Sequence, residues 1–314
     1  MRGVILDADS VGKDVDLSPI TELLDDWQIY ESTLPSETSS RIADAQIVLS
    51  NKIPLNESNL KQSKVQFISV MATGTNNVDL NFTKKQGITV SNAVAYATPS
   101  VVQHTITLIL ALSTNLPAYL RDVRRGAWQH SNVFCLLQHP IREVSGKKLG
   151  IIGFGELGRA VAEASKGLGL DVMVSERPGE ANRPGRREFN DVIAHADYLS
   201  LHCPLTDDNY HMIGPTVLSK MKPSAFLINT ARGGLVDSSA LLAALKTGEI
   251  AGAAVDVLDI EPPKNDESLI TNFDNLLVTP HNAWGAVESR NRLIEQMKEN
   301  IEAYLTNQPK RQVT

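Results

Sequence analysis

Six residues decide the fold, Gly153-Phe154-Gly155-Glu156-Leu157-Gly158, because they follow an apolar run over 149–152 and open a helical pattern. In such a turn the first glycine permits a tight bend, the second lets the backbone approach a pyrophosphate, and the third allows close packing of helix on strand. The amino terminus of the helix adds amide donors and the positive end of its dipole. The stretch therefore predicts a dinucleotide-binding turn at Gly153, Gly155 and Gly158.

Glu176 ends the next predicted strand, at the place where a carboxylate accepts hydrogen bonds from the ribose hydroxyls of a dinucleotide. This carboxylate favours NAD, because it repels the 2′-phosphate of NADP. The loop that follows carries several arginines, which either bind that phosphate or form a solvated basic loop: Arg177, Arg183, Arg186 and Arg187. We therefore expect NAD as the cofactor, with NADP as a secondary one.

Short apolar runs alternate with helical patterns twice along the chain. This alternation is typical of parallel sheets with crossover helices, and six strands in the second series suit a doubly wound sheet. The expected strands are residues 4–6, 47–49, 65–70 and 88–91 in the first series and 149–152, 172–175, 198–202, 225–229, 251–257 and 276–279 in the second. The fold class predicted is α/β, with helices over 156–168 and 238–247 between strands of the second series.

Two longer helical patterns mark the domain boundaries. Residues 99–116 are apolar, with Pro99 in the first turn, and this pattern predicts a helix that is buried all round. The helix could be buried between two subunits. Residues 286–305 form a helix long enough to leave the second sheet and pack on the first. We expect a discontinuous domain of residues 1–98 and 288–314, and a dinucleotide-binding domain of residues 99–287.

The composition excludes several classes of protein. A chain of 314 residues with 42% hydrophobic and 21% charged residues is typical of a globular protein of about two domains. The net charge of −6 and the absence of a basic block argue against nucleic acid, and no apolar run approaches the ~20 residues that span a membrane. Cys135 and Cys203 have no further cysteine partners, so we expect neither a disulfide framework nor a metal site, and a cytoplasmic location.

Three charged or titratable residues follow predicted strands of the second series, namely Arg232, Glu261 and His281. Open α/β sheets bind their ligands at the carboxyl ends of strands. Each residue alone has an ordinary explanation: a surface salt bridge for the arginine, a solvated side chain for the glutamate, and a structural role for the histidine. Their order along the chain, together with the motifs around them, gives the three a common interpretation.

The sequence resembles the D-2-hydroxyacid dehydrogenase family over essentially its whole length. After the glycine stretch, four further motifs stand in family order: His202-Cys-Pro-Leu-Thr206, Asn229-Thr-Ala-Arg-Gly-Gly-Leu-Val-Asp237, Asp256 with Glu261-Pro-Pro, and Thr279-Pro-His-Asn-Ala-Trp284. Within the family the chain is most similar to glycerate dehydrogenases, also called hydroxypyruvate reductases, through segments that begin at Tyr96, Leu112, Trp128 and Phe134. The resemblance implies a Rossmann NAD-binding domain, a flavodoxin-like substrate domain and a cleft between them.

The resemblance also implies the roles of the site residues. His281 would be the acid/base, Glu261 its partner that stabilises the protonated imidazole, and Arg232 the cation that grips the substrate carboxylate and polarises the 2-oxo group. Backbone amides would complete the carboxylate site, and a bulky indole would wall the pocket where many relatives have a small residue. The substrate-binding set is thus Thr73, Gly74, Arg232, His281 and Trp284.

Cofactor contacts follow from the same resemblance. Glu156 and Leu157 would cover the pyrophosphate, and Cys203 and Pro204 would line the adenosine side. The nicotinamide end would be contacted by Thr105, Thr230, Ala231, Arg232 and Asp256, the last of these holding the carboxamide. The family often has a glutamate at the position of Gln103, and this departure puts a helix contact in doubt but not the chemistry.

The activity implied is hydride transfer between NAD(H) and a small D-2-hydroxy acid or 2-oxo acid, with reduction of hydroxypyruvate to D-glycerate as the first expectation. Glyoxylate, a bulkier 2-oxo acid and a phosphorylated hydroxy acid are alternative substrates. A nucleotide-sensing scaffold of the corepressor type is an alternative that is not an enzyme. Burial of residues 101–112 and 128–137 predicts a homodimer built on the second domain.

Overall fold

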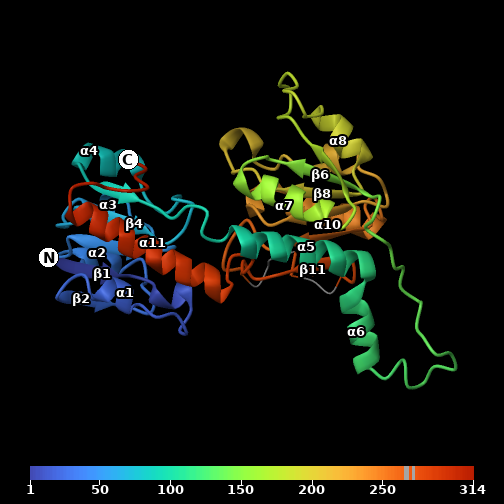
Figure 1. The fold of residues 1–314 in the computed structure, drawn as a ribbon, viewed down its shortest axis with the longest axis horizontal. Coiled ribbons are helices and arrows are strands. Elements are labelled where there is room, and N and C mark those ends of the chain that lie inside the picture. The colour runs from blue at the N-terminus through green and yellow to red at the C-terminus, as the bar shows by residue number, and fades with distance from the viewer. Residues whose placement is uncertain (265–268, 271–272) are drawn as a thin grey trace. The chain divides into compact units, whose positions relative to one another are not determined.

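The computed structural model describes residues 1–264, 269–270 and 273–314, and the chain divides into two units. Unit 1 comprises Met1–Ala97 and Trp284–Thr314, and unit 2 comprises Thr98–Ala283. The chain therefore leaves unit 1 and returns to it once (Figure 1). The sequence predicted domain boundaries after residues 98 and 287, and the two units of the structure divide after residues 97 and 283.

Unit 1 is a five-stranded parallel sheet in the order β2-β1-β3-β4-β5, which is the flavodoxin-like order. Its strands are β1 (Arg2–Ile5), β2 (Asp26–Ile29), β3 (Ile47–Ser50), β4 (Phe67–Val70) and β5 (Thr89–Ser91). Its helices are η1 (Ala8–Val11), α1 (Ser18–Thr21), α2 (Thr38–Ile42), α3 (Glu57–Leu60), α4 (Leu80–Gln86) and α11 (Val287–Leu305). The sequence did not predict β2, because this edge strand is partly exposed and reads Asp-Trp-Gln-Ile without a buried apolar run.

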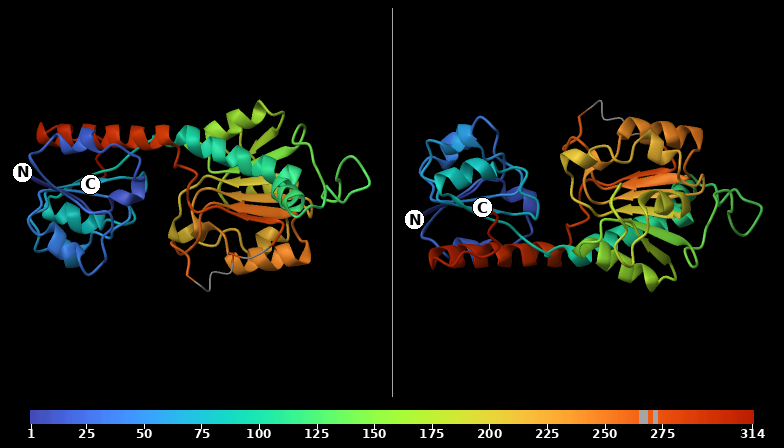
Figure 2. Two further views of the ribbon diagram at one scale, coloured as in Figure 1. Left: turned by 90° about the horizontal axis from the view of Figure 1, so that it is seen from below. Right: turned by 90° about the horizontal axis from the view of Figure 1, so that it is seen from above.

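Helix α11 covers one face of this sheet together with α1, while α2, α3 and α4 lie on the other (Figure 2). Its buried stripe includes Leu293, Ile294, Met297 and Ile301, spaced as the inner face of an amphipathic helix. Near its end, the Tyr304 ring stacks on Phe67 of β4 with centroids 4.4 Å apart. The second segment of unit 1 is thereby packed into the same core as the first.

Unit 2 is a six-stranded parallel sheet in the order β11-β10-β9-β8-β6-β7. The strands are β6 (Lys148–Ile152), β7 (Asp171–Val174), β8 (Tyr198–Leu201), β9 (Phe226–Asn229), β10 (Gly252–Val255) and β11 (Leu276–Val278). The helices are α5 (Thr98–Thr114), α6 (Leu116–Arg124), α7 (Glu156–Lys166), α8 (Phe189–His195), η2 (Asp207–Asn209), α9 (Pro215–Leu218), η3 (Gly233–Leu235) and α10 (Ser238–Thr247). The six strands predicted by the second series are confirmed, and the strand order reverses between β6 and β8.

Apolar cores lie on both faces of this sheet, under α5 and α7 on one side and under α8 to α10 on the other (Figure 2). Within the single chain the long helix is not buried all round, and its further burial between subunits stays a prediction. Helix α5 buries one face, including Leu108, Ile109 and Leu112, whereas Gln103 and Thr107 are exposed. Among the described residues, none of the helices combines the length and the apolar character needed to cross a membrane.

Candidate active site

The turn after β6 holds three glycines, of which two have no room for a side chain and one faces open space. Gly153 has a φ of +90°, and a Cβ there would lie 2.5 Å from the Cys203 nitrogen. A Cβ on Gly158 would lie 2.0 Å from the Gly153 carbonyl oxygen, whereas a Cβ on Gly155 would meet no atom within 4 Å. Space is therefore left above Gly155, at the amino terminus of α7, where a pyrophosphate can approach the backbone.

The residues beside this turn leave the space accessible. Gly155 and Glu156 are exposed, Leu157 is half-buried, and the Glu156 carboxylate accepts a hydrogen bond from the Thr98 hydroxyl. Across the turn, burial raises the pKa of the Cys203 thiol. The thiolate is the nucleophilic form of cysteine, so this side chain suits a wall of the site rather than a reactive group.

His281 and Glu261, which lie 20 residues apart in the sequence, form a pair in unit 2. The His281 Nδ1 lies 2.5 Å from the Glu261 Oε2, and the Leu258 amide donates to the Glu261 Oε1 at 2.8 Å. A histidine bonded to a carboxylate through Nδ1 has its tautomer and orientation fixed, and its Nε2 is left to bond another group. The side chain of His281 is 28% exposed, so a substrate can reach it.

Arg232 follows β9 in a turn that Asn229 holds. The Asn229 side chain donates to the Arg232 carbonyl at 2.8 Å and accepts from the Ala231 amide at 3.0 Å. The half-buried guanidinium donates to the Ala231 carbonyl at 2.7 Å, and no carboxylate of the described residues pairs with it. A guanidinium has five N–H donors, so this cation retains the capacity to grip an anion. Nearby, the hydroxyls of Thr105 and Thr230 are 3.1 Å apart.

Asp256 braces the loop that carries His281, a role that sequence reasoning missed. Its buried carboxylate accepts from the Thr279 hydroxyl at 2.6 Å and from the amides of Asn282 and Ala283 at 3.0 and 2.9 Å. The Asp256 carbonyl accepts from the His281 amide at 2.7 Å. His104 of α5, interpreted from the sequence only as structural, bonds the same Thr279 hydroxyl at 3.0 Å.

The geometry at Glu176 differs from the expectation. Its carboxylate is almost fully buried and is paired with Arg183 and Arg186, rather than left open beside a solvated basic loop. The hydrogen bond from the Arg183 side chain is the main cause that lowers the pKa of Glu176 to about 2, and the amides of Arg177 and Arg183 lower it further against the opposing effect of desolvation. The sequence placed the carboxylate and the arginines in one region but gave no signal of which arginine folds back onto it.

The remaining predicted substrate contacts belong to unit 1. Thr73 and Gly74 lie in the turn after β4, and no described residue accepts a hydrogen bond from their amides, although the Thr73 carbonyl accepts from Asn92 at 2.8 Å. Such amides suit an anion. The Trp284 ring contacts Tyr96 edge-on, with centroids 6.3 Å apart.

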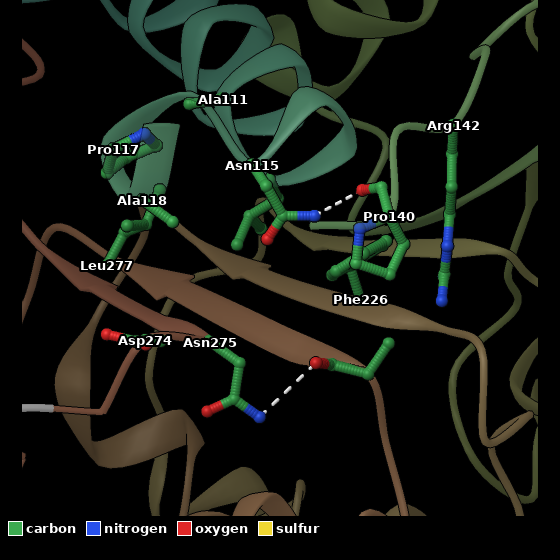
Figure 3. A pocket seen from close by; sticks show the side chains of 12 residues that line it. Ala111, Asn115, Pro117, Ala118, Pro140, Arg142, Phe226, Asp274, Asn275 and Leu277 are labelled. Atoms are coloured by element: carbon green, nitrogen blue, oxygen red, sulfur yellow. Dashed lines mark hydrogen bonds between the residues drawn. The ribbon is translucent and has the colours of Figure 1, made fainter. Parts of the chain in front are cut away.

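A hollow elsewhere in unit 2 lies at the opposite end of the sheet (Figure 3). It is lined by α5 and α6 and by residues at the amino ends of strands, including Phe226 and Asn275. The side chain of Asn275 donates to the Ala251 carbonyl at 3.3 Å. Parallel sheets of this kind bind ligands at their carboxyl ends, and Arg232, Glu261 and His281 of unit 2 each follow the carboxyl end of a strand.

The comparisons with known proteins identify the family of the chain. The family described as D-isomer specific 2-hydroxyacid dehydrogenase, NAD binding domain, matches residues 106–283. The chain belongs to this family, as the sequence motifs predicted, and is an enzyme that acts on the CH–OH group of donors with NAD as its cofactor.

Two curated relatives and one solved structure are more specific. The chain is 42% identical over 287 residues to glycerate dehydrogenase of Methylorubrum extorquens, covering 90% of each chain. It is 34% identical over 296 residues to hydroxypyruvate reductase of Blautia hydrogenotrophica, covering 92% of each. The structure of D-lactate dehydrogenase with NAD+ from Lactobacillus jensenii superposes with a TM-score of 0.80 at 26% identity, over 100% of this chain and 99% of that one.

Proposed function

We propose that this enzyme reduces hydroxypyruvate to D-glycerate with NADH and catalyses the reverse oxidation with NAD. The observation that carries the proposal is the His281–Glu261 pair at 2.5 Å together with the guanidinium of Arg232 in the same NAD-binding unit, which no carboxylate of the described residues pairs with. Relatives named glycerate dehydrogenase and hydroxypyruvate reductase support this choice of substrate.

The proposed chemistry needs a proton donor and an anion site from the chain. Arg232 binds the substrate carboxylate and polarises the 2-oxo group, and the amides of Thr73 and Gly74 complete the carboxylate site. His281 delivers a proton from Nε2 to the oxygen of the 2-oxo group as it gains charge, and Glu261 stabilises the imidazolium before that transfer. NADH, when bound, supplies the hydride.

The cofactor is proposed to lie along the carboxyl ends of the strands of unit 2. The open space above Gly155 and the exposed α7 amino terminus suit the pyrophosphate. Glu176 is assigned to the adenosine ribose. The remaining proposed contacts are Gly153, Glu156, Leu157, Gly158, Cys203 and Pro204 around the pyrophosphate and adenosine, and Thr105, Thr230, Ala231 and Asp256 at the nicotinamide end.

Substrate size is proposed to depend on the third substituent of the 2-oxo acid. Trp284 is a bulky wall, so a hydroxymethyl group or a hydrogen is favoured over a branched or aromatic group. Glyoxylate is the second candidate, since a glyoxylate reductase of Thermococcus litoralis is 36% identical over 250 residues.

The test is a panel of 2-oxo acids assayed with NADH by loss of absorbance at 340 nm. We expect the highest kcat/KM for hydroxypyruvate, a lower one for glyoxylate, and poor turnover of phenylpyruvate and 2-oxoisocaproate. An equal kcat/KM for either bulky acid would reject the assigned substrate and leave the family membership intact.

A homodimer is also proposed, built through residues 101–112 of α5 and an arm of residues 128–137. Figure 1 shows α6 and the loop after it extending from the rest of unit 2. The arm presents Phe134 and Leu137 with 90% and 74% of their surface exposed, and such apolar segments are normally covered by a partner. Light scattering at micromolar concentration tests this: twice the chain mass of 34.2 kDa is expected, and a mass of one chain contradicts it.

The domain roles and the location are part of the same proposal. Residues 99–287 would bind the dinucleotide, and residues 1–98 with 288–314 would bind substrate. A cytoplasmic location is proposed because Cys135 and Cys203 are both free thiols, which fits a reducing compartment.

A further inference from the structure

The Glu176 carboxylate is saturated with hydrogen bonds from its own chain. Oε1 accepts from the Arg177 amide at 2.9 Å, from the Arg183 guanidinium, and from Arg186 at 3.4 Å. Oε2 accepts from Arg183 twice, from the side-chain Nε at 2.7 Å and from the amide at 3.3 Å. A carboxylate offers about four lone-pair sites, so two ribose hydroxyls cannot bind Glu176 while the Arg183 side chain stays in place.

The loop that carries Arg183 is joined to the sheet at its ends, and two of its glycines stand in open space. Its ends are joined to the sheet by the Glu176 amide to the Arg187 carbonyl and by the Arg187 amide to the Val174 carbonyl, each at 2.8 Å. Between them, Gly179 and Gly185 have positive φ and meet nothing within 4 Å at the Cβ position. The Arg183 side chain is 54% exposed, against 1% for Glu176, so the arginine can swing into solvent and the glutamate cannot.

We propose that Arg183 is a cofactor-specificity residue that competes with the ribose of NADH for Glu176 and, once displaced, pairs with the 2′-phosphate of NADPH. This inference rests on the proposed assignment of Glu176 to the ribose. NADH must separate Arg183 from Glu176 to reach the carboxylate, and its adenosine ribose carries no anion at the 2′ position for the released guanidinium. NADPH brings a phosphate at that place, and guanidinium and phosphate form strong charge-assisted hydrogen bonds.

Removing the Arg183 side chain should change the affinities for NADH and NADPH in opposite directions. A binding site that is open in only a fraction of molecules binds more weakly by that fraction, so removing Arg183 frees Glu176 and tightens NADH binding. The same substitution removes the phosphate partner and leaves the 2′-phosphate facing the Glu176 carboxylate, whose remaining arginine side-chain partner is Arg186. We expect NADH to bind about threefold to tenfold more tightly and NADPH about tenfold or more weakly.

The experiment measures nucleotide binding to the whole protein without substrate. Dissociation constants for NADH and NADPH are taken from nucleotide fluorescence for the wild type, Arg183→Ala and a matched control, Arg124→Ala. Arg124 is an exposed arginine at the end of α6 and belongs to none of the proposed cofactor contacts, so the control should change neither constant. Opposite shifts in Arg183→Ala alone are the expected result. Unchanged constants, or weaker NADH binding, in Arg183→Ala would overturn the proposal.

A further variant separates this inference from the ribose assignment on which it rests. Glu176→Gln should weaken NADH binding, because a neutral amide is a poorer acceptor for the ribose hydroxyls. If Glu176→Gln binds NADH as the wild type does, the assignment of Glu176 is wrong. If Glu176→Gln weakens NADH and Arg183→Ala changes nothing, Glu176 holds the ribose and only the competition by Arg183 is wrong.

Discussion

Replacing the second and third glycines of the turn by alanine should separate cofactor binding from folding. In Gly155→Ala the added methyl enters open space and the backbone is extended, with φ −77° and ψ −155°. The free energy of unfolding should therefore change by no more than about 0.5 kcal/mol. The methyl fills the space proposed for the pyrophosphate, so the Kd for NADH should rise about tenfold or more, equivalent to about 1.4 kcal/mol.

Gly158→Ala is the matched comparison. Its Cβ would lie 2.0 Å from the Gly153 carbonyl oxygen, against 3.4–4 Å for ordinary contact, and the obstructing atom is backbone. Such overpacking costs about 1–3 kcal/mol of stability. Urea unfolding without cofactor and fluorescence titration with NADH measure the two effects. Wild-type NADH affinity in a stably folded Gly155→Ala protein would refute the placement of the pyrophosphate.

Two further predictions concern the anion site and a buried histidine. Arg232→Ala should lower kcat/KM for hydroxypyruvate about 100-fold, near 3 kcal/mol, with a much smaller change in the Kd for NADH. The substrate loses its charge-assisted contacts, whereas NADH loses only the one contact at its nicotinamide end that the resemblance gives to Arg232. An equal loss of NADH affinity would contradict the assigned role. Burial lowers the pKa of His202 from 6.5 to about 4, so the unfolded chain takes up this proton first as the pH falls. The stability that neutral His202 contributes is full above pH 6.5 and is lost as the pH falls toward 4, by about 3 kcal/mol at most. Urea unfolding at pH 7 and at pH 4.5 should therefore show a smaller loss of stability for His202→Gln than for the wild type. Equal losses in the two proteins would contradict this.

The sequence was most informative where burial and backbone geometry act locally. Strands of unit 2 read as apolar runs because both faces of a parallel sheet are covered. Helix α10 was predicted with its observed bounds, since Asp237 caps its start and Gly248 ends it in a left-handed conformation. Strand β2 was not predicted because an edge strand can keep polar residues. The face of α5 that is exposed within the single chain was not predicted either, because the composition of this helix is apolar.

The site depended on contacts that no local pattern encodes. The roles of His281, Glu261 and Arg232 came from a resemblance of ordered motifs, and their charges alone supported ordinary explanations. The bracing of the His281 loop by Asp256 joins residues over 20 positions apart, through hydrogen bonds that only the folded chain reveals. The pairing of Glu176 with Arg183 depends on the path of a glycine-containing loop, which the sequence leaves open.

The most direct test of the account is the identity and handedness of the product. Wild-type protein and a His281→Ala variant are incubated with hydroxypyruvate and NADH, and the product is resolved by chiral chromatography while NADH is followed at 340 nm. We expect D-glycerate in amounts equal to the NADH consumed by the wild type, and turnover collapsed in His281→Ala although NADH still binds. Formation of L-glycerate, or turnover by His281→Ala at the wild-type rate, would contradict the account.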